Sequence, residues 1–248
     1  MLPFRPDMVF FDYGGTLSVE GPVTTESAAR SIAAYCDGAE QVTPEKLEEI
    51  GRLWEEITNM AWPKNAERKF SLEYPIMSML RYVMDFAGLK SSLSPVEQEL
   101  RFHQRNATHQ PMPYISELLD ELYRRGIPTG VISNNALSGD GLKAFLDQYL
   151  PNHHFEVILT SADYLCCKPC DRLFLAVCSR VGVDPKKCWY LGDSAIPDVS
   201  GGLSAGMFPI HICRKEEAEP RILDWEGSPY LRVNHWAQLI ELMRSENI

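Results

Sequence analysis

The sequence predicts an α/β protein, in which a Rossmann-like parallel β-sheet carries helices on both faces and an all-α domain is inserted. Short apolar runs, each of the length of a buried strand, alternate with helical segments after residue 113. The first such run, Met8–Phe11, is separated from the others by a long stretch with helical spacing, from about Leu17 to Ala107. This stretch is therefore interpreted as an insertion after the first strand.

The strands of the sheet are predicted from apolar runs that are too short for a helix. These runs are Met8–Phe11, Thr129–Ser133, Phe155–Thr160, Cys188–Leu191 and Phe208–Ile212. Near-continuous apolar character is typical of parallel strands that are covered on both faces. Helices are expected at Tyr114–Arg125 and Asp171–Arg180, because a glycine that can end a helix follows each segment.

The insertion contains three recognisable helix starts. Thr43 and Pro44 combine a cap residue with proline at the first helical position, and the apolar residues that follow recur at helical spacing. Ser71 is expected to cap a second helix, and Ser94 to open a third through a capping box. No strand is expected between Leu17 and Ala107, so the insertion is predicted to be all-α.

These elements define the expected domain boundaries. Residues 1–16 and 111–248 are assigned to the Rossmann-like core, and residues 17–110 to the helical domain. The segment Gln110–Pro113 contains two prolines and is interpreted as the linker that returns the chain to the core.

Composition and charge disfavour several classes of function. The 248 residues include 34 acidic and 24 basic side chains, a formal net charge of −10, which disfavours nucleic acid as a principal partner. No window approaches the roughly 18 unbroken apolar residues of a membrane span, so no membrane association is expected. The seven scattered cysteines, in a sequence without an export signal, indicate reduced thiols and a cytoplasmic location.

Polar side chains stand at the ends of the predicted strands. They are Asp12, Ser133, Lys168, Asp193 and Asp198. Because ligands of a parallel sheet bind beyond the carboxyl ends of its strands, these side chains are expected to lie close together. Carboxylates without histidine or thiolate suit Mg²⁺, and a lysine and a hydroxyl beside that cation suit a phosphoryl group. An aspartate at the centre of such a site can act as a nucleophile.

The motifs around these residues resemble those of the haloacid dehalogenase-like hydrolases. The resemblance covers roughly residues 9–16 and 113–213. FFDYGGT is similar to the first motif of the family, VISNN to the second, Lys168-Pro169 to the third and GDSAIPD to the fourth. Each short motif alone is a weak signal, but four in the right order, each at a predicted strand end, are specific to the family. The helical insertion is similar to the cap domain of the family.

The resemblance implies a role for each motif residue. Asp12 is implied as the nucleophile and Lys168 as the second catalytic residue. The implied ligands of the phosphate are Thr16, Ser133, Asn134 and Lys168, and the implied ligands of Mg²⁺ are Asp12, the backbone carbonyl of Gly14, Asp193 and Asp198. The implied substrate is a small phosphorylated metabolite, which the cap encloses.

Gly14 departs from the pattern of the family. Phosphatases of the family carry at this position a second aspartate, which acts as general acid and base. Its absence is expected to slow proton transfer to the leaving group by about 10²–10⁴-fold, unless another residue, such as His103 or His109, supplies the proton. The expected function is therefore Mg²⁺-dependent hydrolysis through an aspartyl-phosphate at Asp12, with an atypical acid/base position.

The departure at Gly14 leaves three alternatives. One is a protein that binds a phosphorylated metabolite with little turnover. A second is a dehalogenase-like enzyme, which Asp193 and Asp198 disfavour because dehalogenases lack the metal motif. A third is a phosphonoacetaldehyde hydrolase-like enzyme, which requires a Schiff-base lysine in the cap. The lysines of the predicted cap are Lys46, Lys64, Lys69 and Lys90.

Other patterns near the motifs have simpler interpretations. Cys167 and Cys170 form a Cys-x-x-Cys spacing, which is found in redox pairs and in half zinc sites. The sequence contains no second pair of this kind, although His153 and His154 could supply nitrogen ligands. The Lys-Pro pair of the third motif explains the same residues better.

Overall fold

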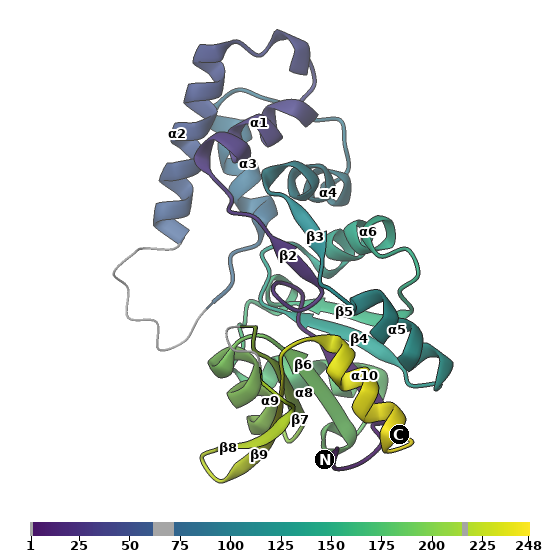
Figure 1. Ribbon diagram of the computed structural model, residues 1–248. Coiled ribbons are helices and arrows are strands. Elements are labelled where there is room, and N and C mark those ends of the chain that lie inside the picture. Colours follow the sequence, from purple (N-terminus) through teal and green to yellow (C-terminus); the bar gives the residue numbers. More distant parts are fainter. Residues whose placement is uncertain (1, 62–71, 215–217) are drawn as a thin grey trace.

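The computed structural model describes residues 2–61, 72–214 and 218–248, and its elements form two regions (Figure 1). A seven-stranded sheet with its helices makes up the lower region of the view. The helices of residues 25–106 form a unit above it, and a two-stranded ribbon lies between the two regions. The predicted α/β class is confirmed.

The order of strands in the main sheet places β1 inside it. The strands are β1 (Met8–Phe11), β4 (Thr129–Ser133), β5 (Phe155–Thr160), β6 (Cys188–Gly192), β7 (Phe208–Ile212), β8 (Arg221–Trp225) and β9 (Ser228–Val233). Their spatial order is β5-β4-β1-β6-β7-β9-β8, and every neighbouring pair is parallel except β8 and β9. Because β1 pairs with β4 and β6, the residues that follow these three strands meet at one edge.

Helices cover both faces of the sheet. They are α5 (Ile115–Arg124), α6 (Gly139–Tyr149), α7 (Ser161–Tyr164), α8 (Asp171–Val181), α9 (Gly201–Ser204) and α10 (Trp236–Ser245), with a 3-10 turn η2 (Pro185–Lys187) and a π-helical turn η3 (Ala195–Ser200). Successive side chains along β1 point to opposite faces of the sheet. Val9 and Phe11 lie in a buried cluster with residues of α5, α6 and α10, whereas Met8 and Phe10 lie in another cluster with residues of α8.

Two helices of the upper unit begin at the predicted positions, Pro44 and Pro95, and the helix that begins at Thr25 was not predicted. The helices of this unit are α1 (Thr25–Tyr35), α2 (Pro44–Ala61), α3 (Ile76–Phe86) and α4 (Pro95–Asn106), with a 3-10 turn η1 (Ala39–Gln41). Ser94 and Glu97 form the predicted capping box at the start of α4. Ser71, the predicted cap of the helix that became α3, lies outside the described residues. The prediction is wrong, because α3 begins only at Ile76, with Pro75 at its N-cap position. None of the described helices is long and apolar enough to cross a membrane.

The core of the upper unit is continuous with that of the sheet region. Ile32 of α1, Val83 of α3 and Phe102 of α4 belong to the same buried cluster as Val9 and Phe11 of β1. A backbone hydrogen bond of 2.7 Å from the Ile76 nitrogen to the Ala136 carbonyl also joins the two regions. The helical unit is therefore packed against the sheet region.

The ribbon between the regions contradicts the expectation that no strand lies between Leu17 and Ala107. Strand β2 (Ser18–Glu20) pairs antiparallel with β3 (His109–Pro111), so that Glu20 lies opposite His109. Each strand has three residues and few apolar ones, which gives no strand pattern in the sequence. The two strands pair because the chain leaves the sheet region and returns to it at neighbouring points. This contact joins residues far apart in the sequence, so a local sequence pattern does not predict it.

Several further elements are absent from the prediction. Helix α6 begins with Gly139 and Gly141, residues of low helix propensity, and Ser138 caps it through the Gly141 backbone nitrogen. The β8–β9 hairpin at the edge of the sheet is mostly exposed or half-buried, and β9 contains Pro229. Strand β9 is nevertheless fixed by its pairing with β7, where Leu231 lies opposite Ile210.

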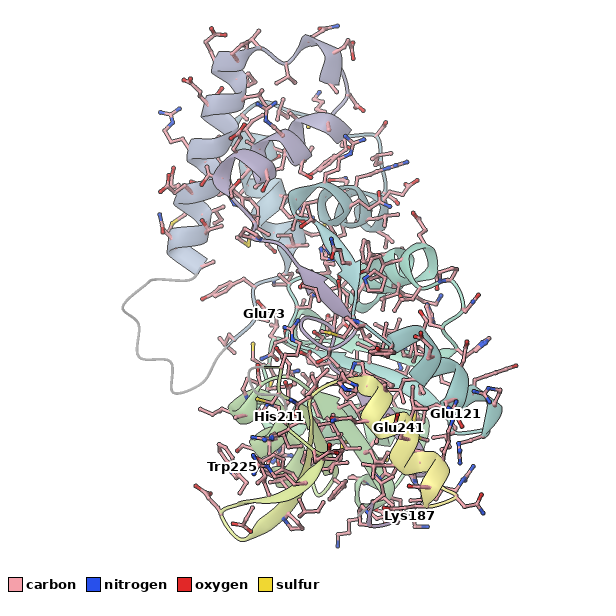
Figure 2. The ribbon with its side chains drawn as sticks, viewed as in Figure 1. Glu73, Glu121, Lys187, His211, Trp225 and Glu241 are labelled. Carbon is pink, nitrogen blue, oxygen red and sulfur yellow. The ribbon has the colours of Figure 1, made fainter. Side chains whose placement is uncertain are left out.

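An ion-pair cluster at Glu121 joins α5 to α10 and generates a stability prediction (Figure 2). The buried Glu121 carboxylate accepts hydrogen bonds from Arg244 at 2.7 Å, Arg125 at 2.8 Å and Arg124 at 2.7 Å. Hydrogen bonds from Arg244, opposed by burial and reinforced by Arg125, lower the pKa of Glu121 to about 2 from the ordinary 4.5. The ionised carboxylate therefore stabilises the fold above pH 4.5, and this stabilisation is lost as the pH falls towards 2.

We expect Glu121→Gln to lower the free energy of unfolding at pH 7 by about 1.5–3 kcal/mol, the range for hydrogen bonds to a charged group. Exposure of Arg244 and Arg124 favours the lower end of that range. Urea unfolding of wild type and variant at pH 7 and pH 3 measures the difference, which should shrink at pH 3. Glu117→Gln, on the exposed side of the same helix, is the control. A difference that is equal at both pH values would contradict this assignment.

Candidate active site

The turn after β1 places Asp12 at the carboxyl edge of the sheet. The Asp12 nitrogen donates to the Leu191 carbonyl of β6 at 2.8 Å, so the backbone of Asp12 still follows the sheet. Gly15 then adopts a φ of +75°, and a Cβ added there would lie 2.2 Å from the Asp193 Oδ2 atom. Glycine is therefore required at this turn both by its conformation and by the close approach of Asp193.

Lys168 is the centre of a buried polar cluster. Its Nζ atom donates to Asp12 Oδ1 at 2.8 Å and to Asp198 Oδ1 at 2.6 Å. Its third contact is the Tyr190 hydroxyl at 2.8 Å, and that hydroxyl donates to the Ile132 carbonyl of β4. Only 1% of the Lys168 side chain is exposed, so its position is fixed by these partners rather than by solvent.

Asn134 positions the loop that carries Lys168. The Lys168 backbone nitrogen donates to Asn134 Oδ1 at 2.7 Å, and Asn134 Nδ2 donates to the Lys168 carbonyl at 3.1 Å. These two contacts tie the loop after β5 to the end of β4. The role of Asn134 as a direct phosphate ligand remains a prediction, whereas its contact with Lys168 is present in the structure.

The fourth motif places two more carboxylates beside Asp12. Asp193 follows β6, and Asp198 lies in the π-helical turn η3, a type of irregular helix that is frequent at functional sites. Asp198 Oδ2 accepts from the Ser194 nitrogen at 2.9 Å, and its Oδ1 accepts from Lys168. Asp198 is therefore held on both oxygens, and Asp193, which accepts from the Ser194 hydroxyl at 3.2 Å, is less constrained.

A cavity of about 320 Å³ brings the predicted site residues together. It is lined by Asp12, Tyr13, Gly14, Glu20, Ser133, Asn134, Asn135, Lys168, Asp193, Ser194, Pro197 and Asp198. Thr16 does not line it: its hydroxyl is buried without a hydrogen-bond partner among the described residues, and its carbonyl accepts from the Trp236 indole at 3.0 Å. The proposed contact of Thr16 with phosphate therefore stays a prediction.

Burial and crowding of the carboxylates favour a cation in this cavity. Burial, opposed by Lys168 and reinforced by the charge of Asp198, raises the pKa of Asp12 to about 6. Burial and Asp198 likewise raise the pKa of Asp193. Although burial opposes it, attraction to Asp12 and Asp198 raises the pKa of Lys168 and keeps it protonated. Excess negative charge therefore remains at the carboxylates.

The donor set fits Mg²⁺. Oxygen atoms of Asp12, Asp193 and Asp198 all lie within 4.8 Å of one another. Hard carboxylate oxygens are the ligands that Mg²⁺ prefers, and the ion usually keeps several waters beside one or two carboxylates. A divalent cation would neutralise the excess charge and lower the pKa of Asp12, so these residues would hold it.

A second cavity of about 490 Å³ adjoins the first and extends beneath the helical unit. The two share Glu20, Asn134 and Asn135. Trp54 of α2 and Phe102 of α4 give it apolar walls. Asn106 also lines this cavity. Its Oδ1 atom, a hydrogen-bond acceptor, is buried and has no hydrogen-bond partner among the described residues. This space suits a small organic group with a hydrogen-bond donor.

Sequence reasoning missed Tyr190 and Glu20. Tyr190 lies in β6 within an apolar run, where only its hydroxyl distinguishes it from an ordinary core aromatic residue. Glu20 lies in a strand that the sequence does not predict. The absence of a carboxylate at Gly14 was a signal that another acid is needed, but it did not indicate which residue supplies it.

The alternative interpretations of the cysteines and lysines find little support. The cysteines are all free, and Cys167 contacts the Glu73 carboxylate, which lies at the level of the ribbon (Figure 2). Lys46 donates to the Ala87 carbonyl and pairs with Glu49, away from both cavities. Lys168 is the one lysine among the described residues that line the first cavity. The predicted candidates Lys64 and Lys69 lie outside the described residues.

Comparisons with known proteins identify the family. A relative named glyceraldehyde 3-phosphate phosphatase, from Methanopyrus kandleri, is 24% identical over 241 residues, which cover 95% of this chain and 96% of the relative. The structure of 2-haloacid dehalogenase from Pseudomonas syringae aligns with a TM-score of 0.61 at 22% identity, over 96% of this chain and 98% of the other. The structure of a phosphatase of the same superfamily from Thermococcus onnurineus aligns with a TM-score of 0.57 at 20% identity, over 95% and 97%.

At these identities the structural likenesses show the fold. The family assignment follows from the sequence, which matches the family described as haloacid dehalogenase-like hydrolase over residues 6–206. This range contains all four motifs and every strand-end residue described above. The chain therefore belongs to the haloacid dehalogenase-like hydrolases and is an enzyme of that family.

Proposed function

We propose that the protein hydrolyses a small phosphorylated metabolite with Mg²⁺, through an aspartyl-phosphate at Asp12. The observation that carries the proposal is the placement of Asp12 in one cavity with a buried ammonium group and two further carboxylates. An anionic phosphoryl group requires positive charge beside the nucleophile, and Lys168 supplies it at 2.8 Å from Asp12 Oδ1.

In the first step, an oxygen of Asp12 attacks phosphorus and the bond from phosphorus to the leaving oxygen breaks. Lys168 neutralises charge on the nucleophile and on the transferred group, while Asn134 and Asp198 hold Lys168 in place. Ser133 at the end of β4 lines the cavity and offers a hydroxyl donor to a phosphoryl oxygen. When bound, Mg²⁺ supplies charge neutralisation at the phosphoryl oxygens.

In the second step, water attacks phosphorus, the bond to the Asp12 oxygen breaks, and inorganic phosphate leaves. Asp12 recovers its carboxylate. Both steps require transfer of a proton, and Gly14 offers no side chain for it. The two steps together convert a phosphate monoester and water into an alcohol and phosphate.

The adjoining cavity is proposed to hold the organic part of the substrate. We propose that residues 17–110 act as a cap over it, because α2 and α4 supply Trp54 and Phe102 to its wall. The relative from Methanopyrus kandleri is named for glyceraldehyde 3-phosphate. A short phosphorylated carbonyl or hydroxyl compound is therefore the first substrate class to test, and a hydroxyl group of such a substrate would donate to Asn106 Oδ1.

Replacement of the nucleophile tests the proposal. We expect Asp12→Asn to lower kcat by about 10³-fold or more, because an amide does not form the acyl phosphate. Phosphate release from a panel of phosphorylated metabolites, with Mg²⁺ and with chelator, is the measurement. Asp147→Asn, on the surface beside Lys143, is the matched control. Full turnover by a folded Asp12→Asn protein would refute covalent catalysis, and binding without turnover by wild type would favour the binding-protein alternative.

The metal assignment makes a separate prediction. Asp193→Asn should weaken Mg²⁺ binding by about 10-fold or more, since a carboxylate ligand becomes a neutral amide. Asp198→Asn should weaken it less, because both Asp198 oxygens already accept hydrogen bonds from protein donors. Calorimetric titration of each folded variant with Mg²⁺ measures the affinities. Equal affinity in wild type and Asp193→Asn would remove Asp193 from the metal site.

A further inference from the structure

The carboxylate of Glu20 occupies the space that a side chain at Gly14 would take. A Cβ added to Gly14 would lie 3.1 Å from Glu20 Oε2. Among the described residues other than the two neighbours of Gly14 in the chain, this is the one heavy atom within 4 Å of that position. Glu20 belongs to β2 and reaches back towards the turn after β1. The acidic group absent from Gly14 is therefore present in the same space, carried by a residue six positions later in the chain.

Glu20 also faces the space where the leaving group is expected. It lines both the cavity that contains Asp12 and the adjoining cavity beneath the helical unit. The bond that breaks joins the phosphoryl group, in the first cavity, to the organic group, in the second. With 31% of its side chain exposed, Glu20 stands at that junction and is accessible to a bound molecule.

His109 turns one ring nitrogen towards Glu20. His109 Nε2 lies 2.7 Å from the His103 carbonyl oxygen, which only accepts, so this nitrogen carries a hydrogen. His109 Nδ1 lies 3.4 Å from Glu20 Oε1. Nδ1 is therefore the His109 nitrogen that faces the Glu20 carboxylate, within ion-pair distance.

Tyr13 and His103 complete the surroundings of Glu20. The Tyr13 hydroxyl lies 3.0 Å from His103 Nε2 and 3.4 Å from His109 Nδ1, so its shorter contact is with His103. Burial, with a smaller contribution from His109, lowers the pKa of His103 to about 3, so that His103 is neutral near pH 7. The groups that face Glu20 are therefore the neutral His103, His109 and the Tyr13 hydroxyl, which is hydrogen-bonded to Glu20.

We propose that Glu20 is the general acid and base of the reaction, in place of the side chain missing at Gly14, and that His109 is a positioning residue that shares its proton. This inference rests on the function proposed above. In the first step, the Glu20 proton moves to the leaving oxygen, which takes the electron pair of the broken bond and leaves as an alcohol. In the second step, the attacking water gives its proton to the Glu20 carboxylate, which restores the acid.

The test compares substrates with poor and good leaving groups. Glu20→Gln should lower kcat for an alkyl phosphate by about 10²–10³-fold, the usual contribution of general acid catalysis. In single turnovers, an aryl phosphate such as 4-nitrophenyl phosphate should lose less than about 10-fold, because its phenolate leaves without a proton. His109→Gln should shift the same ratio by a smaller factor. Glu156→Gln, on the exposed side of β5, is the control and should change neither rate.

A second pair of variants moves the acidic side chain from position 20 to position 14. In Glu20→Ala, the added variant Gly14→Asp should recover at least about 10-fold in alkyl phosphate hydrolysis, since removal of Glu20 frees the space beside Gly14. In the presence of Glu20, Gly14→Asp should instead lower activity, because two carboxylates would compete for one space. Gly14→Asp should therefore raise activity without Glu20 and lower it with Glu20. A general effect of the added charge would have the same sign in both backgrounds.

Each outcome supports or overturns the inference. Equal losses for alkyl and aryl phosphates in Glu20→Gln, or no rescue by Gly14→Asp in a folded Glu20→Ala protein, would overturn it. A transition metal ion retained by purified protein and lost in His109→Ala would also overturn it, because Glu20, His103 and His109 would then be metal ligands. If wild type hydrolysed no phosphate ester and did not differ from Asp12→Asn, the proposed function itself would fail, which is a separate result.

Discussion

The buried contact of Lys168 with two aspartates is the interaction on which the site depends. Taking an ammonium group out of water is costly unless opposite charges and hydrogen bonds replace the lost hydration. Asp12, Asp198 and Tyr190 provide that replacement. Asp12 follows β1, Tyr190 lies in β6 and Asp198 lies in the turn after β6, while Lys168 follows β5. The order β5-β4-β1-β6 in the sheet is what brings the ends of these strands together. The fold therefore places the ammonium group and the two carboxylates so that each charge is balanced by a neighbour of opposite sign.

The ribbon between the two regions gives the insertion a chemical as well as a mechanical role. Strand β2 carries Glu20, strand β3 carries His109, and their pairing sets these residues opposite each other. Tyr13, from the turn after β1, and His103, from α4, complete the surroundings of Glu20. The ribbon thus places the proposed acid–base groups at the boundary of the cavity that holds the nucleophile. A change in how the unit sits on the sheet region would move these groups relative to Asp12.

Prediction from sequence succeeded where the signal is local. The runs at β1, β4, β5 and β7 have the predicted bounds, because mostly buried strands need short, mainly apolar segments that end at a turn. The strand-end residues Asp12, Ser133, Lys168, Asp193 and Asp198 line one cavity, as the geometry of parallel sheets requires. Helix α6 and the β8–β9 hairpin were missed, because glycines at a helix start and exposed edge strands weaken the local pattern.

The sequence by itself determined the α/β class, the family and the side chains that surround the nucleophile, since each depends on short motifs at strand ends. Only the tertiary structure decided what compensates for Gly14. Glu20 meets Gly14 through the turn after β1, and His109 reaches Glu20 across the whole insertion. His103 meets Tyr13 over a separation of 90 residues. Such contacts leave no periodic trace in the sequence, because they depend on how two separately folded segments of chain are brought together rather than on the residues within either one.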